Sequence, residues 1–100
     1  MVKVTVLLPK PENQQAFDDH YFSVHVPLVE NLPQVQDVSI LRTFEVQNMS
    51  IHPYIVAQFS FENREVMDQS LASAEGKALY ADVSNLLDFL PHPPMILFAE

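Results

Sequence analysis

Hydrophobic positions at the start of the chain recur with a period of two, which puts Val2, Val4, Val6 and Leu8 on one face. This alternation predicts a β-strand over residues 2–8. Similar patterns over 38–46 and 54–61 and an apolar run over 95–99 predict three more strands. The polar segment 47–52 separates the second and third strands, so these two are expected to form a hairpin.

A helical period replaces this alternation after Pro11. Asn13 is the expected N-cap of a helix of roughly twenty residues, because its side chain accepts from the free N–H groups of the first turn. Pro27 lacks an N–H for the Ser23 carbonyl, so we expect a kink at Ser23–Pro27 and an end near Leu32–Pro33. One stripe of this helix should face the interior, and it contains Phe17, Tyr21, Val24, His25, Leu28 and Leu32.

Two further helices are expected between the third and fourth strands. Asn63 should cap a short helix through Leu71, and Ser73 should begin a longer one that ends near Leu87. The resulting order is βαββαβ, the ferredoxin-like α+β pattern, in which a four-stranded antiparallel sheet carries its helices on one face. Residues 1–100 are expected to form this single domain.

The face of the sheet opposite the helices is predicted to be unusually apolar. A free antiparallel sheet is normally polar on its solvent side, whereas this face includes apolar side chains from Leu7, Leu41, Tyr54, Val56 and the strand 95–99. Monomers rarely expose a large contiguous apolar area. We therefore expect a second copy of the chain to cover this face in a homodimer.

Composition argues against several classes of function. The chain has no cysteine, which removes disulfides, thiolate metal ligands and a cysteine nucleophile. Its net charge is −8 with only five Lys and Arg, which argues against nucleic acid and membranes as partners. Because no leader peptide and no apolar run of membrane-spanning length are present, we expect a soluble cytoplasmic protein.

No cofactor or metal site is predicted. A single glycine cannot build a glycine-rich phosphate loop, which disfavours nucleotide cofactors. His20 lies about 140° around an α-helix from His25, so these two imidazoles are not expected to share a metal ion.

His25 is the first candidate for catalysis. Its imidazole titrates near neutral pH, and burial would lower its pKa and keep it neutral, which suits a general base. The alternative is a core histidine bonded to a carbonyl that Pro27 leaves free. Tyr21 lies one turn earlier on the same stripe and can orient the imidazole or a substrate, although tyrosines also complete ordinary cores.

Four other polar residues are candidates for binding a substrate. Arg42 falls among apolar positions of its strand, so it can hold a substrate carboxylate, pair with Asp82 or another acid, or turn to solvent at a bulge. Asp82 and Asn85 lie three residues apart on one helix face and can line a pocket. Tyr54 is a similar candidate, and for all of these the alternative is ordinary solvent exposure or structural pairing.

Several motifs together resemble the EthD family of the dimeric α/β-barrel superfamily. The central motif is Tyr21-x-x-x-His25-x-Pro27-Leu28, followed by Leu32-Pro33. Others, spread over essentially the whole chain, are Arg42, Pro53-Tyr54, Leu71-Ala72-Ser73-x-Glu75-Gly76, Ala81-Asp82 with Asn85, and Phe98-Ala99-Glu100. Two positions depart from the family pattern: Gln34 stands where glycine generally follows Leu-Pro, and Pro91-His92-Pro93-Pro94 replaces a glycine-rich segment.

The resemblance implies a ferredoxin-like subunit whose sheets pair face to face in a homodimer, a dimeric α/β barrel. It also implies a pocket between the sheet and the helices of each subunit. Members of the superfamily include cofactor-free monooxygenases, isomerases, polyketide cyclases and haem-degrading enzymes, so activity does not follow from the fold.

Three hypotheses for function follow. The first is a cofactor-independent enzyme, of isomerase, cyclase or monooxygenase type, that acts on a hydrophobic oxygenated small molecule with His25 as acid or base. The second is a non-catalytic dimeric binding or accessory protein that uses the same pocket. The third is a haem-binding protein with His25 as the axial ligand.

Overall fold

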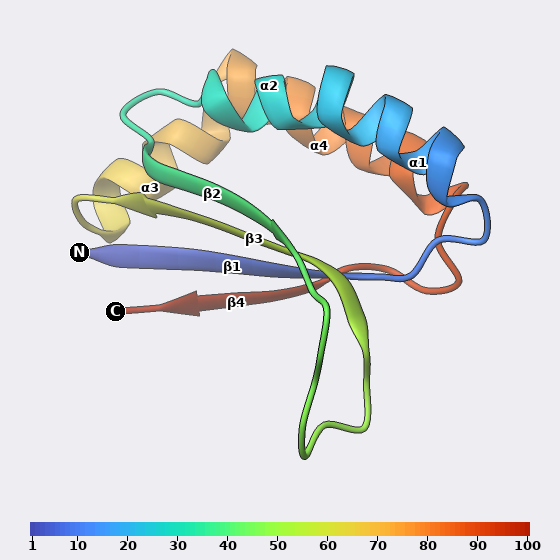
Figure 1. The fold of residues 1–100 in the computed structure, drawn as a ribbon. Coiled ribbons are helices and arrows are strands. Elements are labelled where there is room, and N and C mark those ends of the chain that lie inside the picture. The colour runs from blue at the N-terminus through green and yellow to red at the C-terminus, as the bar shows by residue number, and fades with distance from the viewer.

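A computed structural model describes residues 1–100 and has the predicted ferredoxin-like α+β fold. Its four-stranded antiparallel sheet has the order β2-β3-β1-β4, and the helices lie on one face of it (Figure 1). None of the helices is both long enough and apolar enough to cross a bilayer. The elements are β1 (Val2–Pro9), α1 (Gln14–His20), the π-helical turn η1 (Tyr21–His25), α2 (Val26–Glu30), β2 (Gln36–Arg42), β3 (Pro53–Phe61), α3 (Arg64–Ala72), α4 (Ala74–Leu87) and β4 (Met95–Ala99).

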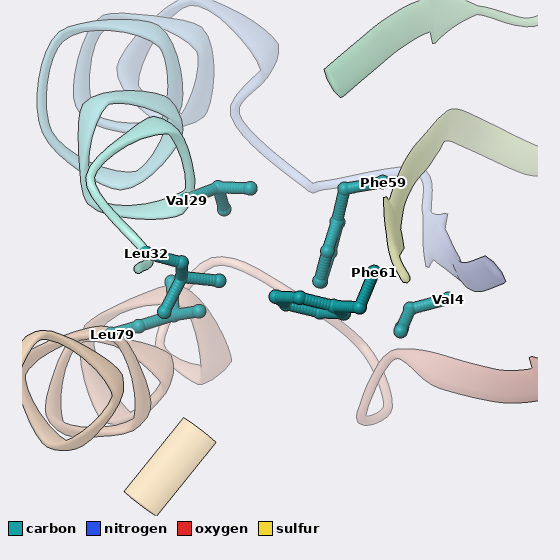
Figure 2. Close-up of a cluster of buried hydrophobic side chains, with 6 residues drawn as sticks. All are labelled: Val4, Val29, Leu32, Phe59, Phe61 and Leu79. Carbon is teal, nitrogen blue, oxygen red and sulfur yellow. The ribbon is translucent and has the colours of Figure 1, made fainter. Parts of the chain in front are cut away.

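The core lies between the sheet and the helices. Phe59 and Phe61 extend from β3 toward the helices, and their rings meet edge to face with centroids 5.9 Å apart. Figure 2 shows the apolar side chains that meet these rings from the helical layer, Val29, Leu32 and Leu79. Removal of these side chains from water is the main force that holds the helices on the sheet.

A π-helical turn interrupts the first helix where a kink was predicted. Asn13 caps α1 as expected, because its side chain accepts a hydrogen bond from the Ala16 N–H at 3.0 Å. In η1 the N–H of Val26 bonds the carbonyl of Tyr21, five residues earlier. The next residue, Pro27, has no N–H for the carbonyl four residues back, which favours a change of pairing at this point.

The π turn changes which residues of the first helix face the core. Those at and before the turn are buried as predicted, namely Phe17, Tyr21 and His25. Val24, however, is 41% exposed, and Val29 rather than Leu28 is fully buried. The predicted stripe is wrong at these positions because it assumed 3.6 residues per turn throughout, and the wider π turn shifts the inward face.

β2 is shorter than predicted, because it ends at Arg42 instead of Val46. As an edge strand it pairs only with β3, and just beyond its end the Thr43 N–H donates to the Tyr54 carbonyl at 3.0 Å. Residues 43–52 then form a loop that projects from the sheet on the side away from the helices (Figure 1). Phe44, at the start of this loop, is 96% exposed.

The outer face of the sheet, opposite the helices, carries one continuous apolar row. The row crosses all four strands through paired residues, Leu41, Val56, Leu7 and Met95. The next row is mixed, because it joins Leu97 to Thr5, Gln58 and Ser39. The apolar part of the face therefore lies at the end of the sheet from which the loop 43–52 departs.

Gln34 has a left-handed backbone conformation, with φ of 60°. This region strains a residue that has a Cβ atom and suits glycine. It is the position at which the sequence pattern described above has glycine, so this departure from the pattern is expected to carry an energetic cost.

Candidate functional site

A cavity of about 260 Å³ lies between the inner face of the sheet and the helices, chiefly α4. Fifteen of its eighteen lining residues have side chains without a polar atom, and the others are His25, Tyr21 and Tyr80. The cavity opens between α4 and β4, where Tyr80, Ile96 and Phe98 are 52%, 49% and 55% exposed. Its walls therefore suit a compact and largely apolar molecule.

His25, the last residue of η1, brings the one imidazole into this wall. It is 9% exposed, and its Nδ1 lies 2.8 Å from Oδ2 of Asp82 on α4. An ionised carboxylate can only accept hydrogen bonds, so Nδ1 carries the proton of the neutral ring. This arrangement leaves the lone pair on Nε2, the other ring nitrogen.

Asp82 is the buried centre of a hydrogen-bond network. It is 6% exposed, and besides His25 it accepts hydrogen bonds from two other side chains. His20 Nε2 lies 2.8 Å from Oδ1 of Asp82, and Asn85 Nδ2 donates to the same oxygen at 2.9 Å. A buried carboxylate is costly unless its oxygens are paired, and these three donors satisfy it.

The network sets the charge states of its members. Burial lowers the pKa of His25 below its ordinary value, although the hydrogen bond and the charge of Asp82 act in the opposite direction. Burial acts to raise the pKa of Asp82, but the hydrogen bonds from Asn85, His25 and His20 together hold it below its usual value. At neutral pH the site therefore contains a neutral imidazole beside an ionised carboxylate.

His20 and His25 reach the same carboxylate although five residues separate them. In an uninterrupted α-helix they would point about 140° apart. The wider turn of η1 lies between them and brings both rings to the side of α4. The expectation that the two rings point apart is wrong for this reason. No group of three or more His, Asp or Glu side chains in the chain is arranged to hold a metal ion.

Tyr21 lines the cavity and packs against His25 by stacking. It is 1% exposed, and its ring lies 5.4 Å from the His25 ring, centroid to centroid, at an angle of 22°. Phe17 stacks on Tyr21 at 5.2 Å. Burial raises the pKa of the Tyr21 hydroxyl well above its ordinary value, so this group stays protonated. The hydrogen bond that orients the imidazole is the one it donates to Asp82, whereas Tyr21 supports the imidazole by ring stacking.

Arg42 and Tyr54 belong to a separate cluster. The Arg42 side chain is 58% exposed, and its Nη2 donates to Oδ2 of Asp18 at 3.0 Å. The Tyr54 hydroxyl donates to Oδ1 of Asp18 at 3.0 Å. The guanidinium also lies over the Phe22 ring, 4.8 Å from its centroid, in a cation–π contact. Arg42 thus pairs with an acid other than Asp82.

The structure brings together only part of the predicted set of site residues. None of the four residues expected to bind a substrate, Arg42, Tyr54, Asp82 and Asn85, lines the cavity. Asp82 instead hydrogen-bonds His25, which does line the cavity, and Asn85 hydrogen-bonds Asp82. Sequence reasoning missed His20. The one available signal was Pro27, because it favours a wider helical turn. Such a turn brings two histidines five residues apart to the same side of the helix.

Comparisons with known proteins identify the family of this chain. Residues 10–90 match the EthD domain. A Rhodococcus erythropolis protein described as an uncharacterised 11.0 kDa protein of the thcB–thcC intergenic region is 36% identical over 85 residues, which cover 85% of this chain and 82% of that protein.

Solved structures share the fold. An EthD-family protein from Bacillus halodurans C-125 superposes with a TM-score of 0.86 at 29% identity, over 100% of this chain and 97% of that one. A protein described as an antibiotic biosynthesis monooxygenase superposes with a TM-score of 0.67 over 100% and 97% of the two chains, and its 14% identity supports the fold alone. With the domain match over most of its length, this chain belongs to the EthD family.

Proposed function

We propose that this EthD-family protein is a small cofactor-independent enzyme of catabolic or secondary metabolism that acts on a hydrophobic, oxygenated molecule. The observation that carries the proposal is the 2.8 Å bond between His25 Nδ1 and Asp82, set in the wall of an apolar cavity. A histidine that only fills a core needs no buried carboxylate. Buried imidazole–carboxylate pairs are a common way to orient a general base.

His25 accepts a proton from the substrate in this proposal. The lone pair on Nε2 takes a proton from an acidic carbon or a phenol, which leaves an enolate or phenolate and a His25 imidazolium. The Asp82 carboxylate, 2.8 Å from Nδ1, stabilises the imidazolium as it forms. Return of that proton to a different atom of the intermediate completes an isomerisation. In a cyclisation the enolate carbon first bonds to a carbonyl carbon of the same molecule, the π bond of that carbonyl breaks, and the resulting alkoxide takes the proton from His25. The protonated hydroxyl of Tyr21 serves as a donor to the substrate.

The cavity limits the class of substrate. With fifteen apolar lining residues and about 260 Å³, it favours a compact molecule whose surface is mostly hydrocarbon. An acidic C–H or O–H group on this molecule has to face His25. Lactones, phenols and small polyketide-like intermediates combine these features.

A non-catalytic binding protein is the second candidate. The observation that favours it is the near absence of polar groups in the wall, where only His25, Tyr21 and Tyr80 accompany fifteen apolar residues. A carrier needs apolar contact and one or two hydrogen bonds, whereas catalysis requires that His25 exchange a proton. Turnover therefore separates the two candidates.

We propose further that the protein works as a homodimer through the outer face of its sheet. The apolar row from Leu41 to Met95 supports this, and so does the 58% exposure of Leu41 and of Leu97. The paired residues of this face include no Asp or Glu, although the chain has thirteen. Two copies of a strongly acidic chain can therefore meet here without bringing carboxylates of the paired residues together.

A ligand screen followed by a turnover assay tests the proposed function. Compact lactones, phenols and diketones are screened by thermal shift, since a bound molecule raises the melting temperature by mass action. Each ligand is then incubated with wild type, His25→Gln and, as a control in an exposed loop, His52→Gln, and its consumption is followed by mass spectrometry. We expect wild type and His52→Gln to convert a ligand that His25→Gln binds without converting.

Three results would argue against the proposal. Equal turnover by His25→Gln would exclude His25 as the acid or base. Binding without turnover by any of the proteins would favour the carrier. A Soret band that appears when haemin is added to wild type and is lost in His25→Gln would favour haem binding instead.

A further inference from the structure

Strand β4 presents an unprotected edge. It lies at one border of the sheet and pairs only with β1, and all five of its residues, Met95–Ala99, are exposed. Each of them is apolar. A free, apolar edge strand invites pairing with another chain unless it is covered. The same strand forms the open side of the cavity through Ile96 and Phe98.

Phe44 is a second exposed apolar group, and it lies at the opposite border of the sheet. It follows the other edge strand, β2, and is 96% exposed on the loop 43–52, which projects to the side where we propose the partner lies (Figure 1). Exposure of a whole phenyl ring forgoes roughly 1.5–3 kcal/mol of burial. The two exposed features therefore belong to the two free edges of one sheet.

The topology brings these edges together in a twofold dimer. Two sheets that face each other close a barrel when β2 of each copy meets β4 of the other. Three antiparallel steps separate β2 from β4 within the sheet, so these strands run in opposite directions. Rotation about an axis along the strands preserves strand direction. The contact between β2 and the partner's β4 is then antiparallel, which allows hydrogen bonding.

The register of the sheet and the alternation along β2 indicate which end and which side of the partner's β4 Phe44 approaches. Leu41 and Met95 lie in the same row of the sheet, so the chain beyond Leu41 runs toward the end at which β4 begins. When β2 continues along the partner, alternation puts Phe44 on the same side as Ile40, which packs against the core. Ile96 is also on the helix-covered side, because it pairs with Val6.

We infer that in the homodimer Phe44 of each copy packs over the open side of the partner's cavity, at its Pro93–Ile96 end. Each site is then complete only with a residue from the other chain. The ring closes the mouth between α4 and β4 with a further apolar surface, in keeping with the lining. This inference rests on the homodimer proposed above and does not depend on whether His25 is catalytic.

Disulfide cross-linking tests the contact directly, because the chain has no cysteine of its own. The variants Phe44→Cys and Ile96→Cys are prepared separately, mixed under conditions that exchange subunits, and oxidised. We expect a covalent dimer in the mixture on non-reducing gels. Neither variant alone should cross-link, because the barrel axis holds the two copies of each position on opposite sides. Phe44→Cys mixed with Val24→Cys, on the surface of the helical layer, is the matched control.

Each outcome decides one point. A cross-link in the Phe44→Cys and Ile96→Cys mixture alone supports the contact. Sedimentation as a dimer without this cross-link overturns the inference but leaves the homodimer in place, as does a cross-link formed by Phe44→Cys with itself. A monomer at micromolar concentration overturns both. As a second measure, Phe44→Ala should raise the dimer Kd at least about tenfold, whereas Val24→Ala should leave it unchanged.

Discussion

At the scale of single residues, Asp82 determines how His25 can act. It accepts a buried hydrogen bond from His25 and partly buried ones from His20 and Asn85. This arrangement fixes the proton of neutral His25 on Nδ1. Asp82 does not line the cavity, so in the proposed mechanism it is a positioning residue.

Replacement of this carboxylate should therefore be costly. In Asp82→Asn the amide offers one acceptor atom where the carboxylate offers two, and it adds a donor that faces the donors of His20 and Asn85. Because hydrogen bonds to buried charged groups contribute about 1.5–3 kcal/mol, we expect the free energy of unfolding to fall by about 2 kcal/mol. Urea denaturation measures this change. Asp68→Asn, at an exposed position of α3, is the control and should change stability by less than about 0.5 kcal/mol.

The lowered pKa of His25 predicts how stability depends on pH. In the unfolded chain histidine titrates near pH 6.5, whereas folded His25 takes up its proton only at lower pH. The unfolded state thus binds more protons between these two pKa values, so the free energy of unfolding should fall as pH drops below about 6.5. Thermal melts between pH 7.5 and roughly pH 5 should show a weaker pH dependence in His25→Gln than in wild type or His52→Gln. Identical slopes in all three proteins would contradict the lowered pKa.

Tyr21, His25, Asp82 and Asn85 were each predicted as site residues from the sequence, but the contacts among them were not. The apolar stripe around Tyr21 and His25 indicated that a phenol and an imidazole are buried side by side, which the structure has. The partner of the imidazole lies 57 residues away on α4, and sequence spacing carries no information about such a contact. His20 was missed because the expected angle between the histidines assumed a regular α-helix.

At the scale of elements, the loop before β2 contains a strained position. Gln34 has φ of 60°, where glycine has no steric penalty and other residues lose about 1–2 kcal/mol. Gln34→Gly should therefore raise the free energy of unfolding by on the order of 1 kcal/mol, less the entropy that glycine adds to the unfolded chain. Chemical denaturation provides the measurement. Gln36→Gly, in β2 and without positive φ, should destabilise instead, and stabilisation by both variants would exclude strain as the cause.

Most elements follow from local signals in the sequence. Asn63 and Ser73 cap α3 and α4 as predicted, each by accepting a hydrogen bond from a backbone N–H three residues later. The end of β2 was not predicted, because the alternation of apolar residues continues to Val46 while the pairing with β3 stops near Arg42. Alternation reports which side chains would share a face, and it says nothing of whether a neighbouring strand is present.

At the scale of the whole molecule, one face of the sheet remains uncovered by the helices. We expect Leu97→Asp, at a position 58% exposed on that face, to raise the dimer Kd at least about a hundredfold, because the symmetric contact would bury two unpaired carboxylates. Analytical ultracentrifugation reports the change. Val24→Asp, at a position 41% exposed on the helical layer, should leave the Kd as it is. An unaffected Leu97→Asp dimer would place the interface on another face. A monomeric wild type would exclude the homodimer.

The proposed function depends most directly on the protonation state of His25. Long-range ¹H–¹⁵N correlation spectra at pH 7 distinguish the two neutral tautomers of histidine from the imidazolium, and the signal missing from His25→Gln identifies His25. We predict a neutral ring with its proton on Nδ1 and an unprotonated Nε2, the form that can accept a proton from a bound substrate. A proton on Nε2 of neutral His25, or a charged ring at this pH, would contradict its assignment as a base oriented by Asp82.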